Sequence, residues 1–284
     1  MSRRFFLFGL GFAGRVIARH LLAAGWSVAG TSRSGDIPDL PGPDLPGIDL
    51  LAFDRDHSLP PGALDGVTAV LSAVPPDDLG DPVLDAMGAA IRAQAPGWIG
   101  YLSTTGVYGD HGGGWVDEAT PPTPGLDRSR RRLAAERAWQ ALPAHIFRLA
   151  GIYGPGRSAL DTVRAGQARR IVKPGQVFSR IHVEDIAAAI VASLARPDPG
   201  AIYNLCDDDP APPQEVIAEA CRLLGVAPPP ELSWEEAKAR LSPMALSFYA
   251  DNKRVSNRRM KQELGVELQY PGFREGLKAI LAGG

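Results

Sequence analysis

The residues with the plainest chemical meaning are three glycines in the segment Gly-Leu-Gly-Phe-Ala-Gly near the start of the chain. The segment follows a short apolar run and opens a helical pattern, which is the context of a dinucleotide-binding turn. In such a turn the first glycine permits the bend, the second lets the backbone approach a pyrophosphate, and the third lets the helix pack on the strand. Free N–H groups at the helix N-terminus then face the phosphates. The sequence therefore predicts a cofactor site formed by Gly9, Gly11, Phe12, Ala13 and Gly14.

The residues about twenty positions further on indicate which dinucleotide binds, because NAD-binding sheets commonly place a carboxylate there against the adenosine ribose. This chain has Thr31-Ser32-Arg33 and no acid at that place. Hydroxyl and guanidinium donors match the oxygens of a 2′-phosphate. We therefore predict that Ser32 and Arg33 bind NADP, with NAD as the alternative cofactor and a solvated loop charge as the alternative role of Arg33.

Short apolar strands alternate with helical patterns through the first half of the chain, which is typical of a parallel sheet covered by helices on both faces. Strands are predicted near residues 5–8, 27–31, 67–73, 98–103 and 144–149. Helices are predicted over residues 14–24, 82–94 and 127–142. The sequence Pro-Asp-Leu-Pro-Gly occurs twice within residues 38–47, and its prolines and glycines predict a surface loop where such a fold often has a helix.

The second half of the chain is less regular and mostly helical. A late strand is predicted at residues 201–205, and helices are predicted over 185–195, 214–224, 234–241, 252–264 and 273–281. The sequence thus predicts an α/β fold, with a doubly wound parallel (Rossmann) sheet and a smaller, mostly helical C-terminal lobe.

The composition is that of an ordinary globular protein, with 284 residues, 45% hydrophobic residues and a formal net charge of -2. The balance of 30 basic and 32 acidic residues gives no general attraction to nucleic acid or a membrane surface, so neither is an expected partner. Cys206 and Cys221 have no metal-ligand spacing, and no metal site is predicted. Reduced thiols and the absence of a long apolar run predict a cytoplasmic protein.

Several further segments carry a family resemblance, and they occur in one order along nearly the whole chain. They are Ser103-Thr104-Thr105-Gly106-Val107-Tyr108-Gly109, Arg148-Leu149-Ala150-Gly151-Ile152-Tyr153-Gly154-Pro155-Gly156, Ile181-His182-Val183-Glu184-Asp185, Tyr203-Asn204-Leu205 and Glu263-Leu264-Gly265. Together with the glycine turn, they resemble the extended short-chain dehydrogenase/reductase family of the epimerase/dehydratase type. The resemblance implies an NAD(P)-binding protein that acts on a small-molecule substrate.

The resemblance also implies roles for individual residues. Asp54 would face the adenine, and Ser72, Ala73 and Val74 would line the dinucleotide. Thr104 takes the place of the family's hydroxyl that bonds the substrate oxygen. The alternatives are turn capping for Asp54 and core packing for the strand residues.

The main departure from the family concerns its Tyr-x-x-x-Lys pair, which exchanges a proton with substrate and holds the nicotinamide ribose. Counting back from Glu136, the tyrosine place holds Arg128 and the lysine place holds Arg132. A guanidinium stays charged at physiological pH and cannot exchange a proton, although Arg132 could still hold ribose hydroxyls. The arginines near this helix start could instead bind an anionic substrate group or form a solvated face.

If the protein is an enzyme, another group must handle the proton. His111 and Tyr153 are the leading candidates, because the resemblance places both segments near the nicotinamide end, and Tyr108 and His182 are the alternatives. A sugar-nucleotide dehydratase is disfavoured, since Thr105 and Gly106 stand where those members have an acidic pair. The predicted catalytic set is therefore Thr104, His111, Tyr153 and Arg132.

The segment 181–205 resembles sheet-domain sequence, so the chain is expected to cross back between two parts. Residues 1–156 and 181–205 would form the dinucleotide-binding domain, and residues 157–180 and 206–284 the substrate lobe. The leading hypothesis is an NADP-preferring oxidoreductase or epimerase-like enzyme with an atypical active site, acting on a carbonyl or hydroxyl. The alternative is a catalytically inactive NAD(P)-binding sensor or scaffold. The family also implies a homodimer paired through two helices, which Leu133 and Trp139 would support only if they faced outward.

Overall fold

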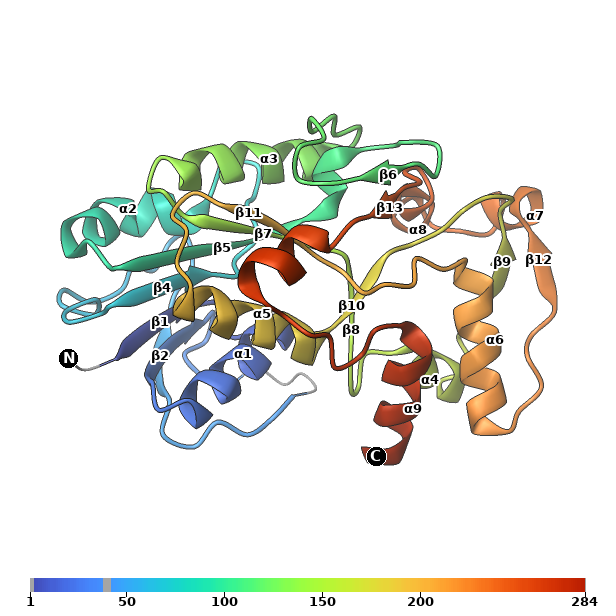
Figure 1. Cartoon of the computed structure of the whole chain (residues 1–284), viewed down its shortest axis with the longest axis horizontal. Coiled ribbons are helices and arrows are strands. Elements are labelled where there is room, and N and C mark those ends of the chain that lie inside the picture. Colours follow the sequence, from blue (N-terminus) through green and yellow to red (C-terminus); the bar gives the residue numbers. More distant parts are fainter. Residues whose placement is uncertain (1–2, 38–41, 284) are drawn as a thin grey trace.

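A seven-stranded parallel sheet forms the centre of the computed structural model, which describes residues 3–37 and 42–283. Its strand order is β11-β7-β5-β4-β1-β2-β3, the order of a doubly wound Rossmann sheet (Figure 1). The strands are β1 (Arg4–Phe8), β2 (Ser27–Ser32), β3 (Asp49–Ala52), β4 (Ala69–Ser72), β5 (Trp98–Thr104), β7 (His145–Leu149) and β11 (Ile202–Leu205). The fold class predicted from the sequence is confirmed.

Helices cover both faces of this sheet, and the central strand shows why. In β1, Phe5 and Leu7 belong to one hydrophobic core, while Phe6 and Phe8 belong to the other, because successive side chains point to opposite faces. The first core includes residues of α1 (Phe12–Ala23) and α5 (Val183–Ala195). The second includes residues of α2 (Pro82–Gln94) and α3 (Asp127–Gln140) (Figure 1).

The connection between β2 and β3 contains no helix in its described residues, 33–37 and 42–48, as the proline-rich repeat predicts. Residues 38–41 of that prediction lie outside the described part of the chain. The short edge strand β3 escaped the sequence analysis because its four residues are exposed or only half-buried, so they lack a buried apolar run.

The C-terminal part of the chain builds a separate small core beside the sheet. Tyr153, Leu160, Val216, Phe273 and Leu277 are among its buried residues. The helices of this part are α4 (Ala159–Arg164), α6 (Pro213–Leu224), α7 (Trp234–Lys238), α8 (Pro243–Phe248) and α9 (Phe273–Gly283). Figure 1 shows α4, α6 and α9 grouped at one end of the sheet. The domain boundaries given above remain predictions.

Short two-stranded sheets lie outside the main sheet. The pairs are β10 (Arg180–His182) with β8 (Gly151–Tyr153), β12 (Glu231–Ser233) with β9 (Arg170–Val172), and β13 (Arg254–Val255) with β6 (Trp115–Val116). The helix predicted over 252–264 is therefore wrong in its first half. The backbone N–H of Arg254 donates to the carbonyl of Gly114, and this strand pairing overrides local helix propensity. Met260–Leu264, labelled η2, is a π-helix, and the 3-10 helix η1 (Thr105–Tyr108) follows β5.

Helix α3 does not present the two apolar residues named as supports for dimer formation. Trp139 is fully buried, and its indole N–H donates to a carboxylate oxygen of Asp81 at 2.9 Å. Leu133 is half-buried against the core. Leu133 and Trp139 therefore do not face outward, which was the condition for their support of a homodimer.

A buried ion pair ties α3 to the middle of the sheet. The Arg148 guanidinium in β7 donates to the Glu136 carboxylate at 2.8 Å, and both side chains are almost completely enclosed. The Ser103 hydroxyl donates to the same carboxylate. Since neither charge contacts water, each depends on the other for its compensation.

A buried carboxyl lies just after β11, where the chain leaves the sheet. Asp207 is 2% exposed, and its Oδ2 has no hydrogen-bond partner among the described residues. Burial raises the pKa of Asp207 to about 8, against the opposing effect of the Arg180 charge. The native state therefore holds a proton that the unfolded state releases near its ordinary pKa of 3.8.

Replacing Glu136 by Gln should lower the free energy of unfolding by about 3–5 kcal/mol, because it leaves the Arg148 charge buried without a partner. Urea unfolding measures this loss. The matched control is Glu235→Gln, since Glu235 pairs with Lys238 at the surface and should leave the midpoint nearly unchanged. Equal midpoints for the wild type and Glu136→Gln would contradict the proposed role of the ion pair.

The stability contribution of Asp207 is full below about pH 4 and is lost as the pH rises toward 8, because the folded-state pKa is raised. Asp207→Asn should remove this part of the pH dependence of the melting temperature. Thermal unfolding from pH 4 to pH 9 compares the two proteins. Parallel curves for both proteins across that range would argue against a protonated Asp207.

Candidate functional site

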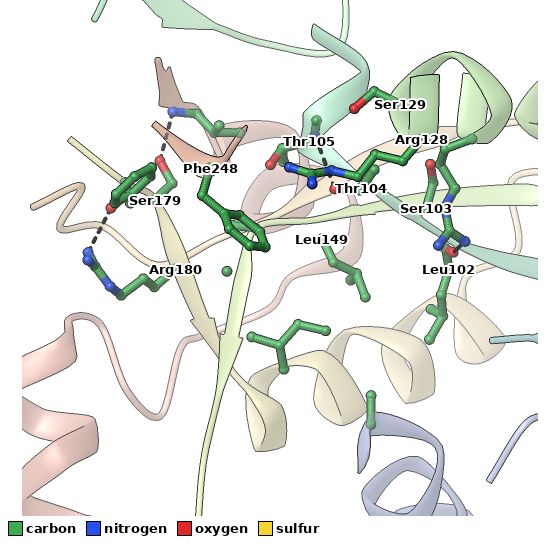
Figure 2. Close-up of a pocket in the computed structure, with 18 of the residues that line it drawn as sticks. Leu102, Ser103, Thr104, Thr105, Arg128, Ser129, Leu149, Ser179, Arg180 and Phe248 are labelled. Atoms are coloured by element: carbon green, nitrogen blue, oxygen red, sulfur yellow. Dashed lines mark hydrogen bonds between the residues drawn. The ribbon is translucent and has the colours of Figure 1, made fainter. Parts of the chain in front are cut away.

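A large cavity of about 850 Å³ opens where the carboxyl ends of the strands meet the C-terminal lobe. Parallel α/β sheets bind ligands at this edge. The lining comes from the turn after β1, the end of β5, the first turn of α3, the segment after β7 and residues 177–180 and 247–255. Figure 2 shows Thr104 and Thr105 beside Arg128, with Phe248, Ser179 and Arg180 further along the cavity.

The glycine turn has the geometry that the sequence predicted. Gly9 has a φ of +94°, which disfavours any side chain, and a Cβ at Gly14 would overlap the carbonyl oxygen of Gly9. A Cβ at Gly11 would meet no atom within 4 Å, although Gly11 lines the cavity. The turn therefore keeps open the space that a pyrophosphate needs.

The N-terminus of α1 faces the same cavity through Phe12, Ala13 and Gly14. No described side chain caps this helix, so its first N–H groups remain available to an anion. The guanidinium of Arg157 lies 5.4 Å from the Phe12 ring centroid and also lines the cavity. A cation and a helix N-terminus together suit the two phosphates of a dinucleotide.

Three further predicted cofactor residues lie at the end of β4 and just beyond it. Ala73 lines the cavity. Ser72 is fully buried and its hydroxyl has no partner among the described residues, while Val74 packs beside Gly9. Of the three, the structure thus brings Ala73 directly to the cavity surface.

The residues predicted to contact the adenosine lie outside the lining of this cavity. The Ser32 hydroxyl donates to the carbonyl of Asp36 at 2.6 Å. Arg33 is exposed and has no partner among the described residues, so its guanidinium is free to meet a ligand. Asp54 accepts hydrogen bonds from the backbone of Asp56 and His57 and from the His57 ring, which is the turn-capping arrangement.

The predicted substrate hydroxyl lies inside the cavity. Thr104 ends β5, and its Oγ1 accepts a hydrogen bond from the Gly106 N–H at 3.1 Å. That bond orients the oxygen and leaves the hydroxyl proton free to donate. Ser129, which the sequence analysis did not consider, lines the same corner, because a Cβ on Gly106 would lie 3.0 Å from Ser129 Oγ and 3.4 Å from Thr104 Oγ1.

The two arginines predicted to stand at the family's tyrosine and lysine places point to different partners. Arg132 donates to the Tyr101 hydroxyl and to the Leu102 carbonyl, both at 3.0 Å, so much of its guanidinium faces the sheet. Arg128 reaches toward the C-terminal lobe instead. It donates to Ser247 Oγ at 2.6 Å, and its guanidinium carbon lies 4.7 Å from the Phe248 ring centroid.

The two predicted proton-handling residues differ in position. Tyr153 lines the cavity, but its hydroxyl donates to the Gly272 carbonyl at 3.3 Å, and burial raises its pKa above the ordinary tyrosine value. His111 lies outside the cavity lining, and its Nε2 is 3.1 Å from the Tyr108 carbonyl. The structure thus brings Tyr153, but not His111, to the cavity with Thr104.

Lys253 is an ionisable residue of the cavity that the sequence analysis missed. Its Nζ donates to the Gly109 carbonyl at 2.8 Å and lies 3.4 Å from the Asp251 carboxylate. Burial lowers the pKa of this lysine below its ordinary value. The incorrect helix predicted over 252–264 concealed it, because a helical pattern gave no reason to direct this side chain toward the segment after η1.

The described residues exclude two features. No cluster of three or more His, Cys, Asp or Glu side chains within them could hold a metal ion. Nor does any helix in that part of the chain have the length and apolar character needed to cross a membrane.

Comparisons with known proteins place the chain in a family. No protein-family model matches it. The protein YeeZ of Escherichia coli (strain K12) is 30% identical over 280 residues, which cover 93% of this chain and 94% of YeeZ.

Two solved structures extend the comparison. A conserved protein of unknown function from Silicibacter pomeroyi DSS is 52% identical, with 99% of both chains covered and a TM-score of 0.89. A Methylobacillus flagellatus protein described as a candidate NAD-dependent epimerase/dehydratase is 27% identical, with 99% of this chain and 98% of that chain covered and a TM-score of 0.74. The chain therefore belongs to the family of YeeZ, among the extended short-chain dehydrogenase/reductase proteins of the NAD(P)-dependent epimerase/dehydratase type.

Proposed function

We propose that this protein is an NADP-dependent oxidoreductase or epimerase-like enzyme that acts on a carbonyl or hydroxyl group of a small polar substrate. The observation that carries the proposal is a single cavity that joins the glycine turn to Thr104 and to the C-terminal lobe. Such a cavity can hold a dinucleotide and a second small molecule side by side. The family membership supports a nicotinamide cofactor, and its adenosine end would meet Arg33.

The bound nicotinamide would accept or supply the hydride. The chain's own contribution begins with Thr104, whose hydroxyl donates to the substrate oxygen while Gly106 fixes its orientation. Donors aimed at an oxygen that gains charge stabilise the transition state without reorganising. Arg132 keeps the ribose side of the cavity positive, although two of its hydrogen bonds go to the protein.

Proton transfer falls to Lys253 in this proposal. In the reducing direction, the substrate oxygen takes a proton from the Lys253 ammonium, and the neutral amine regains one from water. A lysine whose pKa is lowered by burial is a better acid near neutral pH than an exposed lysine. Tyr153 is less suited, because its pKa is raised and its hydroxyl already binds Gly272.

The second candidate function is a nucleotide-binding sensor or scaffold without catalysis. The observation in its favour is the pair of arginines at the tyrosine and lysine places, which hold Ser247 and Tyr101 in fixed contacts. Both candidates keep the glycine turn, so turnover, and not binding alone, separates them.

Arg33→Ala should weaken NADPH binding by about tenfold or more and leave NADH binding unchanged, because only NADPH carries the 2′-phosphate. Fluorescence titration of the purified protein with each nucleotide gives the two dissociation constants. Arg92→Ala removes an exposed arginine of α2 and controls for net charge. Equal losses for both nucleotides would refute the predicted preference for NADP.

Thr104→Val should reduce turnover about 100-fold or more while NADPH binds as before, because one donor to the reacting oxygen is removed. Thr104→Ser keeps the hydroxyl and should retain most of the activity. The assay follows NADPH fluorescence with a panel of carbonyl compounds and sugar nucleotides. Tight NADPH binding with no turnover of any panel member would favour the sensor, and full activity of Thr104→Val would exclude the proposed role of Thr104.

A further inference from the structure

Arg128 brings a positive charge into the cavity and has no acidic partner among the described residues. It stands in the first turn of α3, and its guanidinium contacts Met244 Sδ, Ser247 and the Phe248 ring in the lobe. All of these partners are neutral. Neighbouring arginines of α3 are otherwise engaged: Arg130 with Asp127, Arg131 with Asp78, and Arg132 with Tyr101 and Leu102.

The position of Arg128 on its helix is electrostatically unfavourable. The N-terminus of a 14-residue helix carries a partial positive charge, and a cation in the first turn is repelled by it. An anion bound at Arg128 would relieve this repulsion and would also gain from the helix.

The residue next to Arg128 in the sequence, Ser129, also lines the cavity. Ser129 is only 3% exposed, lines the cavity, and its hydroxyl has no hydrogen-bond partner among the described residues. The Oγ atoms of Ser129 and Thr104 converge on the space beside Gly106. The Ser129 hydroxyl is therefore able to form a hydrogen bond with a ligand in the cavity.

The ionisable side chains that line the cavity give it an excess of positive charge. The charged ones are Arg128, Arg132, Arg157, Arg180, Lys253 and Asp251. Asp251 is near Lys253, and Arg157 lies beside Phe12 at the cofactor end. At the end nearest Thr104, Arg128 and Arg132 make no carboxylate contact in the described residues, and Arg132 already donates to Tyr101 and Leu102.

We propose that Arg128 and Ser129 bind an anionic group of the substrate, a carboxylate or a phosphate, while Thr104 holds the reacting oxygen a few bonds away. The inference rests on the proposed function and narrows its substrate to small carboxylated or phosphorylated carbonyl or hydroxyl compounds. The guanidinium forms paired hydrogen bonds with either group, and the Ser129 hydroxyl adds a third. In this proposal, Arg128 at the family's tyrosine place selects substrates that carry a negative charge.

The test is a calorimetric titration of the NADPH-saturated protein with two probes, oxalate and inorganic phosphate. Saturation with NADPH keeps the probes away from the phosphate-binding turn. The wild type should bind one or both probes, and Arg128→Gln should weaken that binding about tenfold or more. Ser129→Ala should weaken it less. The matched control is Arg131→Gln. In the wild type, the Arg131 guanidinium pairs with Asp78 and does not line the cavity, so this variant should bind the probes as the wild type does.

The probe that the wild type binds more tightly identifies the anionic group. Arg128→Lys gives a second indication, because it should keep most phosphate binding but lose much of the paired recognition of a carboxylate. Circular dichroism and the NADPH dissociation constant check that each variant is folded. Equal probe binding by wild type and Arg128→Gln, or no binding by the wild type, would overturn the subsite. If NADPH itself does not bind, the proposed function fails. The same titration of the nucleotide-free wild type and Arg128→Gln then decides the subsite separately.

Discussion

The close approach of α1 to the end of β1 is the constraint on which the rest of the site depends. A side chain at Gly14 would collide with the carbonyl of Gly9, so a glycine there lets the helix start directly above the strand. The helix N-terminus then points at the carboxyl edge of the sheet, where β4, β5 and β7 also end. Because parallel strands all end at one edge, Thr104 reaches the same cavity as the glycine turn.

Most of the sheet could be predicted from the sequence, because its strands are buried on both faces and read as apolar runs. The errors lie where long-range pairing decides structure. Arg254–Val255 forms a strand only because β6 offers a partner, and no local pattern announces it. The cavity residues differ in the same way: some follow from a local sequence motif, and others are placed by contacts between distant segments. Thr104 was accessible through its motif, whereas Lys253 and Phe248 arrive from the far end of the chain.

The two arginines predicted to stand at the family's tyrosine and lysine places have different surroundings. Arg132 extends to Tyr101 and a strand carbonyl, and Glu136, one turn later, is enclosed with Arg148. Helix α3 is thus fastened to the sheet by polar contacts on its inner side. Its first turn lies at the cavity and keeps Arg128 at the substrate end. In our proposal, Arg128 binds an anionic group of the substrate there and does not transfer a proton.

The contact of Arg128 with Ser247 and Phe248 also links two segments that are far apart in the sequence. Arg128 holds helix α8 against α3 and also lines the cavity, so an occupant that took its N–H groups would compete with α8 for these donors. Thermodynamic linkage makes this exchange reciprocal. A change that weakens the contact of Arg128 with α8 would therefore strengthen the binding of the occupant. Binding of the occupant would in turn weaken the contact between α8 and α3.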